Sequence, residues 1–426
     1  MDVLKLDDNY LNFNIQTLMV LGVWNPFKRE SRYDLLYKYY GIGLFCLAGL
    51  PQMTASVMHA WSNKNDMVAL TQNFTIVAGM ASTLIKVVNL WQRQTDVKKL
   101  VDLLNYERRQ PCYRKFAIYR EKIVTGTIRI CKLFSLTFIV MVFWYAVFLY
   151  GRILVYHKGN VDMLPLSPIV RCPPNKTSLY WLLFIYDATS FCYIAGAVAS
   201  QDSLFMVFLI HLATQLDLVE QRLIFCHDKL GPEYEAAHIE KVIDRQDFKI
   251  ECVCRSNVEQ VSIDPVTELQ ICIEHHQQII RCVNLVQSIF NHTLLLQFAT
   301  SLVMITMTGF QLVAGRRLSS NEFIEQVTLF LCALFQLFIY CWFGTDIIAK
   351  KRFQSQSLNT SAYNSKWYIA DERFKKTLKI LMCKGQVPIK IRVGYVFELS
   401  STTFMNASEL MFDKKKRKEL VQIQNK

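Results

Sequence analysis

The chain has 426 residues, of which 52% are hydrophobic and 13% aromatic, and its formal net charge is +13. A soluble chain of this length would form two or three domains, whereas this apolar content fits one helical bundle in a bilayer. The basic residues collect in alternate gaps between apolar stretches, which is how orientation signals of membrane proteins are placed. We therefore expect a lipid bilayer, and no nucleic acid, as the partner of the positive charge.

Six stretches are apolar, nearly free of charge and at least as long as the about 20 residues that a membrane-crossing helix needs. Asp187 and Asp202 interrupt the fourth stretch, and both should face the bundle, because a carboxylate facing lipid costs several kcal/mol. Pro51 should kink the first helix, and a weaker seventh candidate begins near Val393. The six predicted spans are Leu35–Trp61, Met67–Trp91, Val124–Tyr150, Ser178–His211, Ser288–Val313 and Phe323–Ile348.

Lys and Arg crowd the N-terminal segment, the segment between the second and third spans, and the segment after the sixth. Basic residues mark the cytoplasmic side of a membrane protein, so the N-terminus is predicted to be cytoplasmic. Met1–Tyr10 has neither the basic start nor the apolar run of a signal peptide. Residues 151–176 then form an external loop, in which Asn175 begins the tripeptide Asn-Lys-Thr, a glycosylation acceptor.

The cytoplasmic segments contain helical patterns of their own. Asp96–Arg108 alternates apolar and charged residues at helical spacing, and from Ser262 an apolar repeat runs straight into the fifth span. A helix of some fifty residues rises about 75 Å, so its first half must project into the cytoplasm. Cys252 and Cys254 lack any usual zinc spacing to the histidines that follow them. We expect neither a metal site nor a cofactor.

Seven blocks in the second half of the chain stand in a characteristic order: Asp202–Phe205, Cys272–Arg281, Ala362–Tyr368, Phe374–Lys376, Pro388–Lys390, Gly394 and Leu399–Phe404. Their order and spacing resemble the signature of insect odorant receptors. Seven-span G-protein-coupled receptors are disfavoured, because they place the N-terminus outside and carry motifs that are absent here. The resemblance covers the whole chain in architecture and chiefly residues 202–404 in sequence.

The resemblance implies an all-α membrane protein, a bundle of seven transmembrane helices with a cytoplasmic N-terminus, inverted relative to G-protein-coupled receptors. It also implies an odour-gated, non-selective cation channel of four subunits in the plasma membrane of a sensory neuron dendrite. The compact Asp217–Asn257 region is similar to that of odour-tuning subunits, which pair with a shared co-receptor. The implied regions are a six-span bundle (1–348), a linker with an anchor helix (349–385), a short seventh helix (386–412) and a basic tail (413–426).

In the family a short cytoplasmic helix before the seventh span forms contacts between subunits, and here it corresponds to Ser365–Cys383. Its aromatic and aliphatic residues alternate with lysines, which suits packing in an assembly. The alternative for each is ordinary helix packing within one chain. The predicted interface residues are Trp367, Tyr368, Phe374 and Leu378.

The outer halves of the spans are rich in aromatic residues and methionine, as a pocket for a small volatile apolar ligand requires. Three residues of the third span share one helix face, and residues of the second, fourth and sixth spans lie at comparable depth. The alternative for each is packing in the bundle or contact with lipid. The predicted ligand-binding residues are Phe74, Thr137, Val140, Trp144, Phe191, Ile194 and Phe330.

The seventh segment departs from the family pattern. As a helix, Leu399–Phe412 rises only about 21 Å, and five basic residues follow within 413–418. The chain is then either a non-conducting variant with an altered C-terminal end, or a subunit whose last helix ends early in a solvated tail. A gustatory-type receptor channel subunit is a further alternative, although the seventh-helix pattern of that class is absent. No span carries a paired acid or a His/Asp arrangement suited to catalysis, so an enzyme is not expected.

Overall fold

The computed structural model describes a helical bundle. The described residues are 11–27, 32–62, 64–65, 67–106, 110, 114–156, 177–225, 265–313, 323–324, 326–343, 367–385, 392–393 and 397–398. The elements in chain order are α1 (Asn12–Val20), α2 (Arg32–Leu44), the π-helical segment η1 (Phe45–Gly49), α3 (Leu50–Ser62), α4 (Met67–Gln92), α5 (Gln94–Leu104), α6 (Arg114–Tyr156), α7 (Thr177–Phe225), α9 (Pro265–Val313), the helix Gln326–Phe343, the 3-10 turn η4 (Trp367–Ile369), α11 (Glu372–Gly385), β1 (Arg392–Val393) and β2 (Phe397–Glu398).

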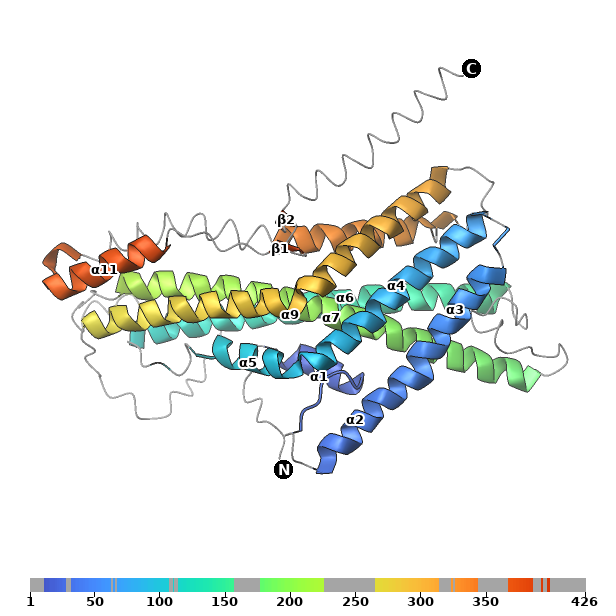
Figure 1. Cartoon of the computed structure of the whole chain (residues 1–426), viewed down its shortest axis with the longest axis horizontal. Helices are drawn as coiled ribbons and strands as arrows, with labels where there is room; N and C mark the ends of the chain where they lie inside the picture. The colour runs from blue at the N-terminus through green and yellow to red at the C-terminus, as the bar shows by residue number, and fades with distance from the viewer. Residues whose placement is uncertain are drawn as a thin grey trace, which may run out of the picture.

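Six helical segments within the described ranges are long and apolar enough to cross a membrane, and each overlaps one of the six predicted spans. The long apolar repeat leading into the fifth span is confirmed as a single helix, α9, of 49 residues. At 1.5 Å per residue α9 measures about 74 Å, more than twice the hydrocarbon core. Figure 1 shows α7 running alongside α6 and, in the half of the bundle nearest α11, alongside α9, with α11 lying over the end at which α9 begins.

The first predicted span is a continuous helical path with an irregular turn in the middle. Pro51 has no N–H, so the carbonyl of Leu47, four residues before it, cannot receive the usual helical hydrogen bond. The structure places the π-helical segment η1 just before this proline, ending at Gly49, two residues earlier. The hydroxyl of Tyr186, on α7, donates to the Leu47 carbonyl oxygen. A side chain of a neighbouring helix thus satisfies the acceptor that the proline leaves free.

The N-terminal helix α1 was not predicted from the sequence, and it packs inside the bundle. Leu11, Ile15 and Leu18 are at most 2% exposed. The Asn14 amide Nδ2 lies 2.9 Å from Ser135 Oγ on α6 and 2.8 Å from Ser203 Oγ on α7. The signal for α1 was weak, because its nine residues are too few for a membrane span and carry no amphipathic pattern.

The C-terminal elements begin later than expected. The cytoplasmic helix predicted as Ser365–Cys383 is instead the 3-10 turn η4 followed by α11 from Glu372. The prediction that a seventh helix begins near Val393 was wrong. Residues 392–393 instead pair with residues 397–398 as two short antiparallel strands, with Arg392 opposite Glu398 and Val393 opposite Phe397. A seventh helix can therefore begin only after Glu398, and that part of the chain lies outside the described residues.

Candidate functional site

A buried carboxylate joins helices that are far apart in the sequence. Asp202 on α7 is 1% exposed, and its Oδ1 lies 2.7 Å from Lys86 Nζ on α4 and 2.7 Å from the Tyr340 hydroxyl. The amide of Gln336 donates to the other carboxylate oxygen, and Lys86 also bonds Gln297 Oε1 on α9. We call these five residues the Asp202 network: through them four helices meet at one charge pair.

The depth of the network follows from its place along the helices. Asp202 lies about 37 Å along α7 from Thr177 and Lys86 about 28 Å along α4 from Met67, at 1.5 Å per residue. The network therefore lies toward the cytoplasmic end of the membrane-crossing part. Removing one member of such a buried pair leaves the other charge without compensation. The sequence analysis missed Lys86, although a lone lysine closing an apolar run, with an aspartate in another span, was an available signal.

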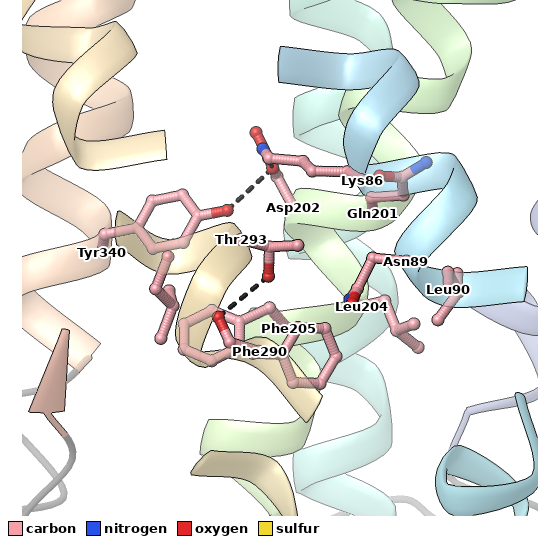
Figure 2. Close-up of a pocket in the computed structure, with 11 residues that line it drawn as sticks. Lys86, Asn89, Leu90, Gln201, Asp202, Leu204, Phe205, Phe290, Thr293 and Tyr340 are labelled. Atoms are coloured by element: carbon pink, nitrogen blue, oxygen red, sulfur yellow. Dashed lines mark hydrogen bonds and ion pairs between the residues drawn. The ribbon is translucent and has the colours of Figure 1, made fainter. Parts of the chain in front are cut away.

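A small cavity adjoins the network. Figure 2 shows Lys86 and Asp202 pointing toward each other, and Tyr340 reaching Asp202 from a neighbouring helix. The cavity measures about 20 Å³, enough for roughly one water molecule, whereas sites for small organic molecules measure about 300–1,000 Å³. The Gln201 amide is 6% exposed, and neither its nitrogen nor its oxygen has a partner among the described atoms. This cavity suits a water molecule and is too small for an odour molecule.

The second carboxylate of the fourth span is also buried, at the outer end. Asp187 is 0% exposed, and the Tyr150 hydroxyl of α6 shares its single proton between the Asp187 Oδ2 at 3.0 Å and the Asp187 backbone carbonyl oxygen at 3.1 Å. The ring of Tyr150 lies 5.7 Å from that of Phe191 and 5.6 Å from that of Phe184, centroid to centroid. The expectation that both aspartates face the bundle is confirmed.

Three of the predicted ligand-binding residues lie against neighbouring helices. Ile194 is 5% exposed and packs with Met80 of α4 and Tyr193, and Phe191 packs beside the same group. Phe330, on the helix Gln326–Phe343, lies so close to Gly309 of α9 that a Cβ there would come within 3.5 Å of its ring. Phe191 and Ile194 therefore belong to one outer cluster, which lies between α4, α7 and the end of α2 with η1, and Phe191 also contacts Tyr150 of α6. Phe330 packs against the main core instead.

The other four predicted ligand-binding residues face outward. Trp144 is 71%, Val140 56% and Phe74 50% exposed. Thr137 is exposed too, and its hydroxyl bonds the Leu133 carbonyl at 2.9 Å in its own helix. In a single chain these side chains meet lipid or another protein rather than Ile194. A pocket that is lined by both the buried and the exposed residues of this set therefore needs another protein surface or a different helix arrangement to enclose it.

The predicted interface residues divide in the same way. Phe374 is 0% and Leu378 4% exposed, and both pack into the main core, which α9 shares. Trp367 is half-buried against that core. Tyr368 is 64% exposed and is the member of the set that a second subunit can reach directly. Asn175 lies outside the described residues.

The cytoplasmic halves of α7 and α9 carry their own buried pair. Arg222 is 1% exposed, and its Nε and Nη2 lie 3.0 and 2.8 Å from Glu268 Oε2. The guanidinium also lies 5.5 Å from the Phe116 ring centroid. Nearby, the Tyr106 hydroxyl donates to Glu274 at 2.6 Å, and burial, followed by this carboxylate, raises the pKa of Tyr106 to about 12.

Within the described ranges, no three His, Cys, Asp or Glu side chains come close enough to hold a metal ion. The bundle of membrane-crossing helices with buried charge pairs defines a multi-pass helical membrane protein. The sequence model described as "7tm Odorant receptor" matches residues 66–412. The chain therefore belongs to the 7tm odorant receptor family, a family of receptors.

Relatives and solved structures agree with this assignment. Odorant receptor 67a of Drosophila melanogaster is 21% identical over 415 residues, covering 93% of this chain and 91% of that protein. Odorant receptor 13a of the same species is 23% identical over 429 residues, covering 92% of each chain. The olfactory receptor OR5 of Machilis hrabei matches with a TM-score of 0.68 at 14% identity, covering 95% of this chain and 96% of that one. Its structure in complex with eugenol matches with a TM-score of 0.69 at 15% identity. The predicted fold class, family and multi-pass membrane localisation are confirmed.

Proposed function

We propose that this chain is the odour-binding subunit of a ligand-gated, non-selective cation channel that it forms with a shared co-receptor. The observation that carries the proposal is the family match over residues 66–412 together with a fold shared over 95% of the chain with an olfactory receptor. The complex of that receptor with eugenol supports a small organic ligand. The seventh segment would line the pore, as the family resemblance implies.

The proposed ligand site is the outer cluster around Phe191 and Ile194, extended by Phe74, Thr137, Val140, Trp144 and Phe330. Burying roughly 200 Å² of an apolar ligand gives about 5 kcal/mol at about 25 cal/mol/Å², which corresponds to sub-millimolar affinity before costs. Shape rather than strong polar contacts would then set the tuning. Val140 and Trp144 face away from the bundle, so either α6 must rotate or a neighbouring chain must cover them for these two residues to line the site.

The proposed assembly surface is the cytoplasmic end that α11 covers. Phe374 and Leu378 hold α11 to α9, while Tyr368 and Ile380, at 64% and 60% exposed, lie on the outside. We assign the first pair to the support of the surface, and Tyr368 and Trp367 to the contact with a second subunit. Apolar side chains of this size on an exposed helix are typical of protein interfaces.

The test is whole-cell recording from cells that express this chain alone, an odorant receptor co-receptor alone, or both, during exposure to an odour panel that includes eugenol. We expect a current evoked by a panel odour that the co-receptor alone does not give. The amount of each chain at the cell surface is measured in the same cells. Odour-independent solute uptake by the chain alone would contradict the proposal. Suppression of co-receptor currents at normal surface amounts would instead identify the non-conducting variant.

A further inference from the structure

One glutamine side chain on α9 binds the backbone at the strand that precedes the seventh segment. The Gln287 oxygen Oε1 accepts from the Arg392 backbone N–H at 2.7 Å, and the Gln287 nitrogen Nε2 lies 2.5 Å from the Arg392 carbonyl oxygen. The same Nε2 donates to Asn291 Oδ1 at 2.9 Å. All the donors and one acceptor of this amide are thus used, and Asn291, at 2% exposed, fixes its orientation.

The contact lies where the last part of the chain leaves α9. β1 packs against α9 and turns back into β2, which ends at Glu398, and the apolar seventh segment follows directly in the sequence. In Figure 1, β1 and β2 lie beside the middle of α9. Gln287 stands one turn before Phe290, which lines the cavity next to Asp202. This contact, which we call the Gln287 clamp, therefore joins the strand before the seventh segment to a part of α9 about 15 Å along the helix from Gln297, the α9 member of the Asp202 network.

The geometry is specific to a glutamine. A side-chain amide that gives one donor and one acceptor to a single residue replaces the pair of bonds that a neighbouring strand would make. Leucine has a similar size but neither group. Glutamate keeps the acceptor for the Arg392 N–H and places a negative oxygen against the Arg392 carbonyl. Because both bonds go to the backbone, the identity of the side chain at 392 is unimportant to the clamp.

We propose that Gln287 is a positioning residue for gating: by clamping the backbone of Arg392 it carries movements of α9 to the seventh segment. This inference rests on the proposed function, because gating presupposes a channel. A displacement of α9 reaches the seventh segment through these two bonds and the short β1 contact. Without the clamp, the same displacement of α9 lets β1 slide along α9 and does not reach the seventh segment.

The electrical test compares Gln287→Leu, Gln287→Glu and the control Arg392→Ala with the wild-type chain, each expressed with the co-receptor. The probe is the panel odour that evokes the largest wild-type current. Gln287→Leu removes both bonds to Arg392, so it should raise the half-maximal odour concentration at least about fivefold, the factor that one net hydrogen bond is worth, and should lower the maximal current at an unchanged surface amount. Gln287→Glu should change in the same direction, and Arg392→Ala should match the wild type. Wild-type concentration dependence for Gln287→Leu, or a loss of current that follows the surface amount alone, would overturn the inference.

A second measurement needs no current. Hydrogen exchange of the purified assembly should show the Arg392 amide protected in the wild type and exchanging about fivefold faster in Gln287→Leu. Equal exchange in the two proteins would refute the clamp itself. If the wild-type pair gives no odour current while exchange shows the clamp, the proposed function fails and the contact stands. The two failures are therefore distinguishable.

Discussion

The Lys86–Asp202 pair gives a quantitative prediction. Lys86→Met removes the ammonium and leaves a carboxylate that is 1% exposed with the Tyr340 and Gln336 donors alone. Asp202→Asn leaves the lysine, whose side chain is 7% exposed, without a counter-charge. Breaking a buried pair from one side costs about 3–5 kcal/mol, because an uncompensated charge remains. Each single variant should therefore be strongly destabilised.

The double variant Lys86→Met with Asp202→Asn separates this account from simple loss of packing. Replacing both charges removes the uncompensated charge, so the cost should fall below about 2 kcal/mol and the two single effects should not add. At about 2.1 cal/mol/K per residue over 426 residues, 1 kcal/mol shifts the midpoint by roughly 1 °C. The single variants should then lower the thermal midpoint by about 3–6 °C and the double variant by about 2 °C or less.

The assay is thermal unfolding of the purified chain in one detergent, followed by fluorescence-detected size exclusion. Lys132→Met, which removes an exposed lysine of α6, is the matched control and should leave the midpoint unchanged. Single-variant shifts that add up in the double variant would refute the reasoning. A Lys86→Met midpoint equal to that of the wild type would refute it as well.

Three further predictions concern the first span, the ligand site and the topology. Tyr186→Phe should lower the free energy of unfolding of the wild-type chain by about 1 kcal/mol, measured by thermal unfolding. In a Pro51→Ala background the same change should have no effect, because the alanine N–H can bond the Leu47 carbonyl oxygen in place of the tyrosine; an equal loss in both backgrounds would contradict this. Trp144→Ala should shift the rank order of odours in the paired recording, whereas an unchanged order would place this side chain in lipid. Asn175→Gln should abolish the mass shift that a glycosidase produces on the wild-type chain, and a glycosidase shift that persists in this variant would contradict the assignment of Asn175.

Long-range apolar patterning accounts for what the sequence predicted well. Charge-free stretches longer than a bilayer leave few alternatives to spanning helices, so the six described spans and the 49-residue α9 followed from composition and period alone. The burial of Asp187 and Asp202 followed from the cost of a carboxylate in lipid. Arg222 and Glu268 lie in segments that were recognised as helical, but their pairing depends on how α7 and α9 are rotated.

Side-chain partners and helix faces could not be predicted in the same way. The residues next to Lys86 in the sequence give no sign that its Nζ lies 2.7 Å from Oδ1 of Asp202, which follows 116 residues later. Equal depth on four helices made Phe74 and Ile194 equivalent candidates, yet one is 50% and the other 5% exposed. The clamp of Gln287 on the Arg392 backbone carries no sequence signal at all, because any residue except proline supplies its partner groups.

The most direct test of the central claim is the odour-evoked current of cells that express this chain with the co-receptor, recorded while Na⁺ and K⁺ are exchanged outside the cell. The account predicts a current that appears only with odour and only with both chains, and whose reversal potential stays the same when one cation replaces the other. Two results would contradict the account: no odour-evoked current although both chains reach the cell surface, or an odour-evoked current that only one of the two cations carries.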